Sequence, residues 1–181
     1  NRRTAALHIV GNELQVRVPK QVRDKSIIEI LQKKRSWIKG KVEKLKAVSI
    51  PKPKEFVSGE AFSFLGQNYR LKIQEGHRLG VEMREGYLLA TVCPSLEEEQ
   101  KKQKVQEYLD HWYRCRAKER LHEKVEHFSK QIGVLSKGLR VGSYKSKWGS
   151  CDRQGNLTFN WNLIKAPHSI VDYVVIHGFF N

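Results

Sequence analysis

One histidine near the end of the sequence lies in a pattern that is typical of zinc-dependent hydrolases. Residues 171–177 read Val-Asp-Tyr-Val-Val-Ile-His, an apolar stretch that ends on His177. In the pattern His-Glu-x-x-His, two histidines four residues apart share one helix face, and the glutamate activates the metal-bound water. Here Gly178 stands in the glutamate position and Asn181 in the position of the second histidine.

The chemistry that these residues allow is therefore incomplete. Catalytic zinc sites use three protein ligands, so His177 alone marks an incomplete metal site. Gly178 occupies the general-base position without a side chain that could take a proton, and we expect no catalytic residue there. From spacing alone, one histidine at the end of an apolar helix is more often a packed or capping residue than a ligand.

The charge of the chain favours contact with polyanions. Lys and Arg number 34 against 19 Asp and Glu, a formal net charge of +15, which attracts phosphates nonspecifically. The basic residues are concentrated between Lys20 and Lys54, where a solvated helix explains them as well as a phosphate-binding one. A second basic cluster, from Lys137 to Arg153, surrounds the Trp-Gly-Ser-Cys stretch at 148–151.

Cysteine usage and hydropathy predict a cytoplasmic protein without membrane contact. Cys93, Cys115 and Cys151 are far apart and form no Cys-x-x-Cys pair, which is typical of a reducing compartment. No stretch approaches the roughly 20 apolar residues of a membrane span. The first residues also do not resemble a signal peptide.

The elements that would position His177 alternate between strands and helices, which predicts an α+β fold. Alternating apolar residues predict a hairpin over 5–18 with its turn at Gly11-Asn12. A helix over 26–47, capped by Ser26 and Glu29, is followed by a linker at 51–54. Glycine-separated runs predict an antiparallel sheet; they cover residues 61–65, 69–73, 79–83 and 87–92.

The second half of the chain contains the longest predicted element. A helix begins at Ser95, capped by Ser95 and Glu98, and ends at Gly133. Strands are expected over 139–164 around a turn at 152–155. The terminal helix follows Ala166-Pro167, with His168 or Ser169 near its cap and Asp172 in its first turn, where the helix dipole favours negative charge.

A family resemblance rests on residues 144–177. Tyr144 to Cys151 reads Tyr-Lys-Ser-Lys-Trp-Gly-Ser-Cys, and the stretch 156–164 reads Asn-Leu-Thr-Phe-Asn-Trp-Asn-Leu-Ile. Together with Ala-Pro at 166–167 and the apolar stretch that ends on His177, this order and spacing resemble the YgjP-like family of predicted zinc metallopeptidases, and more loosely SprT-like proteases. The opening of the chain also resembles the family, so the likeness covers nearly all of it as a single domain, 1–181.

The resemblance implies a zincin-like metallopeptidase fold that hydrolyses peptide or protein substrates with zinc as cofactor. Its parts would be a basic hairpin and helix (1–50), a sheet (55–93), a long helix (95–132) and a strand region with a truncated active-site helix (139–181). We expect this copy to be inactive and to bind no zinc. We interpret Gly178-Phe179, which stands where the family has Glu-Leu, as the result of a frameshift. The codons GAG-CTT read GGC-TTT when one base is lost. The rival explanations are a genuinely short, non-enzymatic protein and a gene fragment without function.

The resemblance also implies a substrate groove near the Trp-Gly-Ser-Cys turn. Its candidate residues are Trp148, Gly149, Ser150, Cys151 and Asn160. The functional interpretation places this turn and the strand 156–161 beside an extended peptide. The structural interpretation has Trp148 fill the core and Gly149 adopt a backbone angle that other residues resist.

The remaining candidate groups favour no specific chemistry. Cys151 has no histidine nearby in sequence that would activate it as a nucleophile. His111, His122 and His127 show no pair at the four-residue spacing of a metal-binding helix face and are expected to be solvated or interfacial. His168 is expected to be a loop residue and not a ligand. The alternative function is a basic nucleic-acid-binding or scaffold protein without catalysis.

Overall fold

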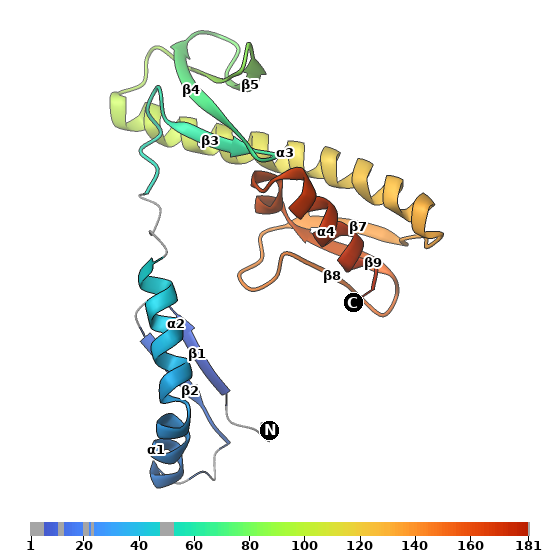
Figure 1. Ribbon diagram of the computed structural model, residues 1–181. Helices are drawn as coiled ribbons and strands as arrows, with labels where there is room; N and C mark the ends of the chain where they lie inside the picture. The colour runs from blue at the N-terminus through green and yellow to red at the C-terminus, as the bar shows by residue number, and fades with distance from the viewer. Residues whose placement is uncertain (1–5, 11–12, 20–21, 23, 48–52, 181) are drawn as a thin grey trace. The chain divides into compact units, whose positions relative to one another are not determined.

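The computed structural model describes residues 6–10, 13–19, 22, 24–47 and 53–180, which form two compact units, Asn1–Pro53 and Lys54–Asn181 (Figure 1). The boundary falls inside the predicted linker, 51–54. The predicted turn at Gly11-Asn12, residues 51–52 of the linker and Asn181 lie outside the described residues. The α+β class is confirmed, because both units combine helices with antiparallel or mixed strand pairs.

The first unit contains a hairpin and two helices. β1 (Ala6–Val10) pairs antiparallel with β2 (Glu13–Arg17), as the alternation of apolar residues predicted. The single helix predicted over 26–47 is wrong in two respects. α1 (Asp24–Lys33) begins before Ser26, which therefore lies inside the helix and not at its cap, and α2 (Arg35–Ala47) is separated from α1 at Lys34. The residue at the interruption is a lysine and not a glycine or proline, so the break between α1 and α2 is not explained by residue type.

The second unit opens with a four-stranded mixed sheet. Its strands are β3 (Ala61–Phe64), β4 (Gln67–Glu75), β5 (Gly80–Arg84) and β6 (Tyr87–Val92), in the order β3-β4-β6-β5. The prediction of a purely antiparallel sheet is wrong, because β4 and β6 are parallel. Two tight hairpins, β3–β4 and β5–β6, are joined side by side through β4 and β6, so that β5 lies at the edge.

Both hairpin turns have the backbone that a two-residue connection between twisted strands favours. Leu65 and Gly66 have φ of 49° and 83°, and Glu85 and Gly86 have φ of 51° and 80°. Positive φ at both central residues is the signature of a type I′ turn, which matches the right-handed twist of the strands. Glycine at the second position of each turn adopts this conformation without steric cost.

A long helix, α3 (Glu98–Ile132), carries the rest of the unit. The predicted cap at Ser95 is wrong: Glu97 is the N-cap and forms a capping box with Gln100, while Ser95 contacts Cys93 Sγ at 3.1 Å. The predicted end is confirmed, because Gly133 has a φ of 74° and donates its N–H to Ser129 O. One apolar stripe of α3 is buried; it consists of Val105, Leu109, Trp112, Tyr113, Ala117, Leu121 and Val125.

A second, three-stranded sheet follows α3, and Figure 1 shows both sheets on this helix. β7 (Gly138–Gly142), β8 (Gly149–Cys151) and β9 (Asn156–Asn160) are arranged in the order β7-β9-β8, with β8 at an edge. The turn between β8 and β9 is confirmed. The strand predicted to continue to 164 is wrong, since Trp161–Lys165 forms the 3-10 helix η1.

The terminal helix, α4 (His168–Gly178), runs from Pro167 as predicted. Its N-cap is Pro167, without a side-chain cap, and Asp172 lies beyond the first turn, so the predicted dipole interaction is wrong. The Asp172 carboxylate instead forms an ion pair with Lys124 of α3. None of the helices in the described part of the chain is long and apolar enough to span a membrane.

The first sheet contacts the start of α4 through its hairpin turn. Leu65 N donates a hydrogen bond to Ile164 O at 2.8 Å. Gly66 packs so closely on Pro167 that a Cβ at position 66 would lie 2.7 Å from Pro167 Cα. A side chain at position 66 is therefore excluded by the positive φ and by this contact together.

Candidate functional site

His177 lies on the last turn of α4 as the sequence predicted, and its side chain is exposed. The ring centroid of Tyr173, one turn earlier, is 5.6 Å from that of His177, with an interplanar angle of 38°. Ile170 and Val174 precede His177 at spacings of seven and three residues, which places all three on one face of the helix. The part of this face that carries Ile170 and Val174 borders a hollow.

The hollow, of about 820 Å³, separates this face of α4 from the loop that precedes β8. Ile170 and Val174 line it from the helix, and Trp148 lines it from the loop. The cationic and polar side chains that line it are Lys145, Lys147, Lys165, Tyr144, Ser146, Asn160 and Asn162. Among the residues that the structure describes, no carboxylate lines the hollow, which therefore favours an anionic ligand.

Trp148 does not fill the core. Its side chain is 57% exposed, so the structural interpretation of this residue is wrong. The core position belongs to Trp161, which is 6% exposed and donates from Nε1 to Ser143 Oγ at 2.8 Å. Trp148 thus presents an indole ring to the hollow, where it can contact a ligand.

Asn160 lines the hollow but is itself buried. Its Nδ2 donates to Tyr144 O at 2.8 Å, and its Oδ1 accepts from Asn162 N at 3.0 Å. The backbone N of Asn160 also donates to Trp148 O at 2.9 Å. These bonds hold the loop 144–148 against η1, so that Asn160 positions the wall of the hollow.

The other three candidates form the edge strand β8 and do not line the hollow. Gly149 does not have a positive φ; the expectation of a special backbone angle is wrong, and the reason for glycine is packing. A Cβ at position 149 would lie 2.7 Å from the ring of Phe159 on the neighbouring strand. Ser150 Oγ accepts from Lys147 Nζ at 2.8 Å, and Cys151 Sγ donates to Asp152 O at 3.4 Å.

Gly178 is buried beside His177 and faces the second sheet. A Cβ built there would lie 3.1 Å from Phe159 Cζ and 3.6 Å from Leu157 Cδ2. Within the described residues, no group of three His, Cys, Asp or Glu side chains is placed to hold a metal. The donors in the described part of the chain therefore do not fit the zinc site that the resemblance implies.

Lys165 is a lining residue that sequence reasoning missed. Its Nζ lies 4.6 Å from the ring centroid of Trp161 and 4.8 Å from that of Tyr113. Burial lowers the pKa of Lys165, opposed by the nearby charge of Asp110. The spacing of four between Trp161 and Lys165 is a signal that could have indicated this cation–π contact.

The remaining histidines that approach other polar groups lie away from the hollow. His111 on α3 approaches Cys115 Sγ at 3.5 Å, across the four-residue spacing of one helix turn. His127 and His168 both line a separate surface depression, together with Glu123 and Asp172. Neither group is placed to hold a metal among the described residues.

A family model described as YgjP-like, metallopeptidase domain, matches residues 3–179. The match covers nearly the whole of both compact units. No curated protein matches the chain, and no solved structure matches it.

Proposed function

The chain belongs to the YgjP-like metallopeptidase-domain family, and from that premise we propose that it binds acidic, extended peptides in the hollow between α4 and the loop 144–148. The observation that carries the proposal is the lining of this hollow. Three lysines and an exposed indole face an apolar helix surface that leads to His177, and no carboxylate among the described residues lines the hollow.

The edge strand β8 does not line the hollow, but it begins where the loop 144–148 ends, and we propose that an extended ligand continues from the hollow along β8. Trp148 directly precedes β8, and β8 pairs with β9 on one side only within the described sheet. A peptide that adds to a sheet edge gains main-chain hydrogen bonds, and pockets for alternate side chains give it specificity. The apolar side chains of Ile170 and Val174 would receive one face of such a peptide.

The lysines support the acidic character of the ligand. Lys147 is held by the Ser150 hydroxyl and lies 4.9 Å from the ring centroid of Tyr144, while Lys165 is half-buried between two aromatic rings. An ammonium group whose burial disfavours its charge is stabilised by a carboxylate that enters the hollow. Glutamate and aspartate side chains are the peptide groups that supply it.

We further propose that residue 178 leaves this domain without the general base of its family. Gly178 has no proton acceptor, and its Cβ direction leads to the ring of Phe159. Water activation by this position is therefore absent from the chemistry that the described residues can perform. Peptide binding without cleavage at this position is the activity that remains.

The binding proposal is tested with two labelled peptides, acetyl-(Glu-Ala)₅-amide and acetyl-(Lys-Ala)₅-amide, by fluorescence anisotropy. We expect the acidic peptide to bind and W148A to weaken its binding by roughly tenfold, since removal of a central aromatic contact usually costs more than 1 kcal/mol. Tyr87→Ala, which removes an exposed aromatic ring on the other sheet, is the matched control. Equal binding of both peptides, or equal losses in both variants, would overturn the proposal.

The absence of a general base is tested by mass spectrometry of the acidic peptide after incubation with the protein and zinc chloride. We expect the peptide to stay intact. Cleavage that stops in H177A would show that hydrolysis does not need a side chain at position 178.

A further inference from the structure

The four-stranded sheet has one face toward α3 and an outer face, on which Leu89 and Thr91 of β6 are buried while the cationic side chains of β4 and β5 are exposed. Alternate side chains of each strand point to opposite faces. The set that includes Leu71, Leu88 and Val92 is buried in the core with α3. The other set forms rows across the sheet, and the strand register defines them as Arg70–Tyr87–Arg84, Lys72–Leu89–Glu82 and Gln74–Thr91–Gly80.

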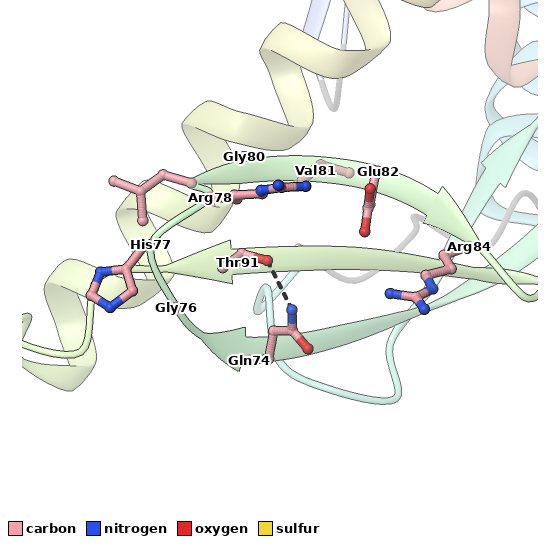
Figure 2. A pocket seen from close by; sticks show the side chains of 10 residues that line it. Gln74, Gly76, His77, Arg78, Gly80, Val81, Glu82, Arg84 and Thr91 are labelled. Atoms are coloured by element: carbon pink, nitrogen blue, oxygen red, sulfur yellow. Dashed lines mark hydrogen bonds between the residues drawn. The ribbon is translucent and has the colours of Figure 1, made fainter.

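A hollow of about 620 Å³ lies on this outer face, where the loop 76–80 joins β4 to β5 (Figure 2). Figure 2 shows the side chains of Arg78 and Arg84 over the sheet near the two ends of β5, with Glu82 between them. Gln74 Nε2 donates to Thr91 Oγ1 at 3.1 Å and forms the floor.

The outer face is basic. Arg70, Lys72, Arg78 and Arg84 are exposed, and Glu82 lies among them. Arg84 also forms an exposed ion pair with Glu85 of the adjoining turn at 3.6 Å, so four cations face two carboxylates. Glu75, although on β4, has the opposite orientation and pairs with Lys101 of α3 at 2.8 Å. Its charge is therefore neutralised on the inner side of the sheet.

One aromatic ring lies in the middle of a cationic row. Tyr87 is 45% exposed, and the register places it directly opposite Arg70 on one side and Arg84 on the other. Strands are spaced by 4.7–4.9 Å, so the two guanidinium-bearing residues start about 10 Å apart across Tyr87. An exposed aromatic ring flanked by cations on a sheet is the arrangement on which unpaired bases stack while phosphates meet arginines.

We propose that this outer face, defined by Arg70, Lys72, Arg78, Arg84 and Tyr87, binds single-stranded nucleic acid. Charge complementarity favours a polyanion, and the ring favours one that carries exposed bases. An acidic peptide would meet the same cations but would gain little from Tyr87. A duplex keeps its bases stacked on one another, so it could not use the ring either. The proposal is independent of the hollow beside α4.

The test uses the full chain and a fluorescein-labelled twelve-nucleotide oligo(U) in fluorescence anisotropy. We expect Y87L to weaken binding about tenfold and Y87F to retain it, since stacking needs the ring and not the hydroxyl. R70A/R84A should lower the slope of log affinity against log salt by about 1.4, since each lost phosphate contact on a single strand contributes about 0.7. K102A/R153A, which removes two exposed cations elsewhere in the same unit, is the control and should change the affinity far less.

The location is tested by cross-linking 4-thiouridine in the same oligonucleotide and mapping the labelled peptides by mass spectrometry. Cross-links within residues 70–91 are expected. Cross-links confined to α1 and α2, equal losses in Y87L and Y87F, or tighter binding of polyglutamate than of oligo(U) would each overturn the proposal.

Discussion

The ring of Phe159 packs directly against the backbone of Gly178. A Cβ at position 178 would lie 3.1 Å from Phe159 Cζ, and one at Gly149 would lie 2.7 Å from the same ring. The ring thus occupies the space between an edge strand and the last turn of α4 and is completely buried. Any side chain at position 178 would therefore need the ring of Phe159 to shift, so packing favours glycine there, apart from the carboxylate that glycine lacks.

Gly178→Ala should destabilise the protein by about 1–2 kcal/mol. Extra atoms in a packed core cost about this much, and the gain in helix propensity is small at a helix end. Urea unfolding of the wild type, G178A, F159L and F159L/G178A measures the effect as a double-mutant cycle. We expect G178A to cost less in the F159L background, where a smaller side chain leaves room. The same cost in both backgrounds would show that Phe159 does not limit position 178.

Asn160→Ala should lower the free energy of unfolding by about 1–3 kcal/mol, because Asn160 is buried and the substitution leaves the Tyr144 carbonyl and the Asn162 N–H without their partner. N68A removes an exposed asparagine that accepts from Ser63 Oγ, and should stay within about 0.5 kcal/mol of the wild type. Chemical unfolding measures both variants. Equal values would mean that the loop 144–148 is held by other contacts.

The carboxylate of Asp152 makes the stability of the turn after β8 depend on pH. Its carboxylate accepts from Asn156 Nδ2, Asn156 N and Gln154 N, each at 2.9 Å, and these bonds lower the pKa of Asp152, the Asn156 side chain most of all. A carboxyl whose pKa is lower in the folded state stabilises the fold above its unfolded pKa and loses that effect as pH falls through the folded value. D152A should therefore melt below the wild type at pH 7, and thermal melts should converge at pH 2. A constant difference at both pH values would contradict this assignment.

Replacement of Lys165 should raise the stability of the fold at pH 7 but weaken the binding of an acidic ligand. Burial lowers its pKa, so in the folded state protonation is disfavoured, and the wild type gains stability as pH rises from the folded pKa toward the unfolded value of 10.5. K165M lacks this gain and should melt above the wild type at pH 7, with the difference narrowing toward pH 10.5. The same variant should bind the acidic peptide more weakly at pH 7. A melting temperature below the wild type at pH 7 would show that the ammonium group contributes more through its aromatic contacts than burial costs.

Local features of the fold could be predicted because they depend on neighbouring residues. Short runs separated by glycines indicated the strands of the four-stranded sheet, and Gly66 and Gly86 marked two of its turns. The parallel contact between β4 and β6 could not be predicted, because it depends on how two complete hairpins associate. The 3-10 helix at Trp161–Lys165 was missed for a different reason, since its residues read as an apolar strand.

In the candidate site, too, the local features could be predicted from the sequence and the features that depend on distant contacts could not. The helix that carries His177 follows from apolar composition and a preceding proline, and the family signature placed Trp148 and Asn160 near it in sequence. The opposite burial of these two residues depends on the path of the loop 144–148, which brings Tyr144 O to Asn160 Nδ2. The contact of Lys165 with Trp161 is local in sequence, but its contact with Tyr113 involves the separate helix α3, and for that reason the position of Lys165 at the hollow was missed.

The close contact of Gly66 with Pro167 joins the four-stranded sheet to α4, so the second unit should unfold cooperatively. The turn between β3 and β4 is joined to the start of α4 by the Leu65–Ile164 hydrogen bond and by a contact that leaves no room for a Cβ at Gly66. Neither sheet can then separate from α3 without disturbing the other. Amide protons of α4 should consequently exchange with solvent at the same rate as those of the β3–β4 hairpin, through one common opening of the second unit.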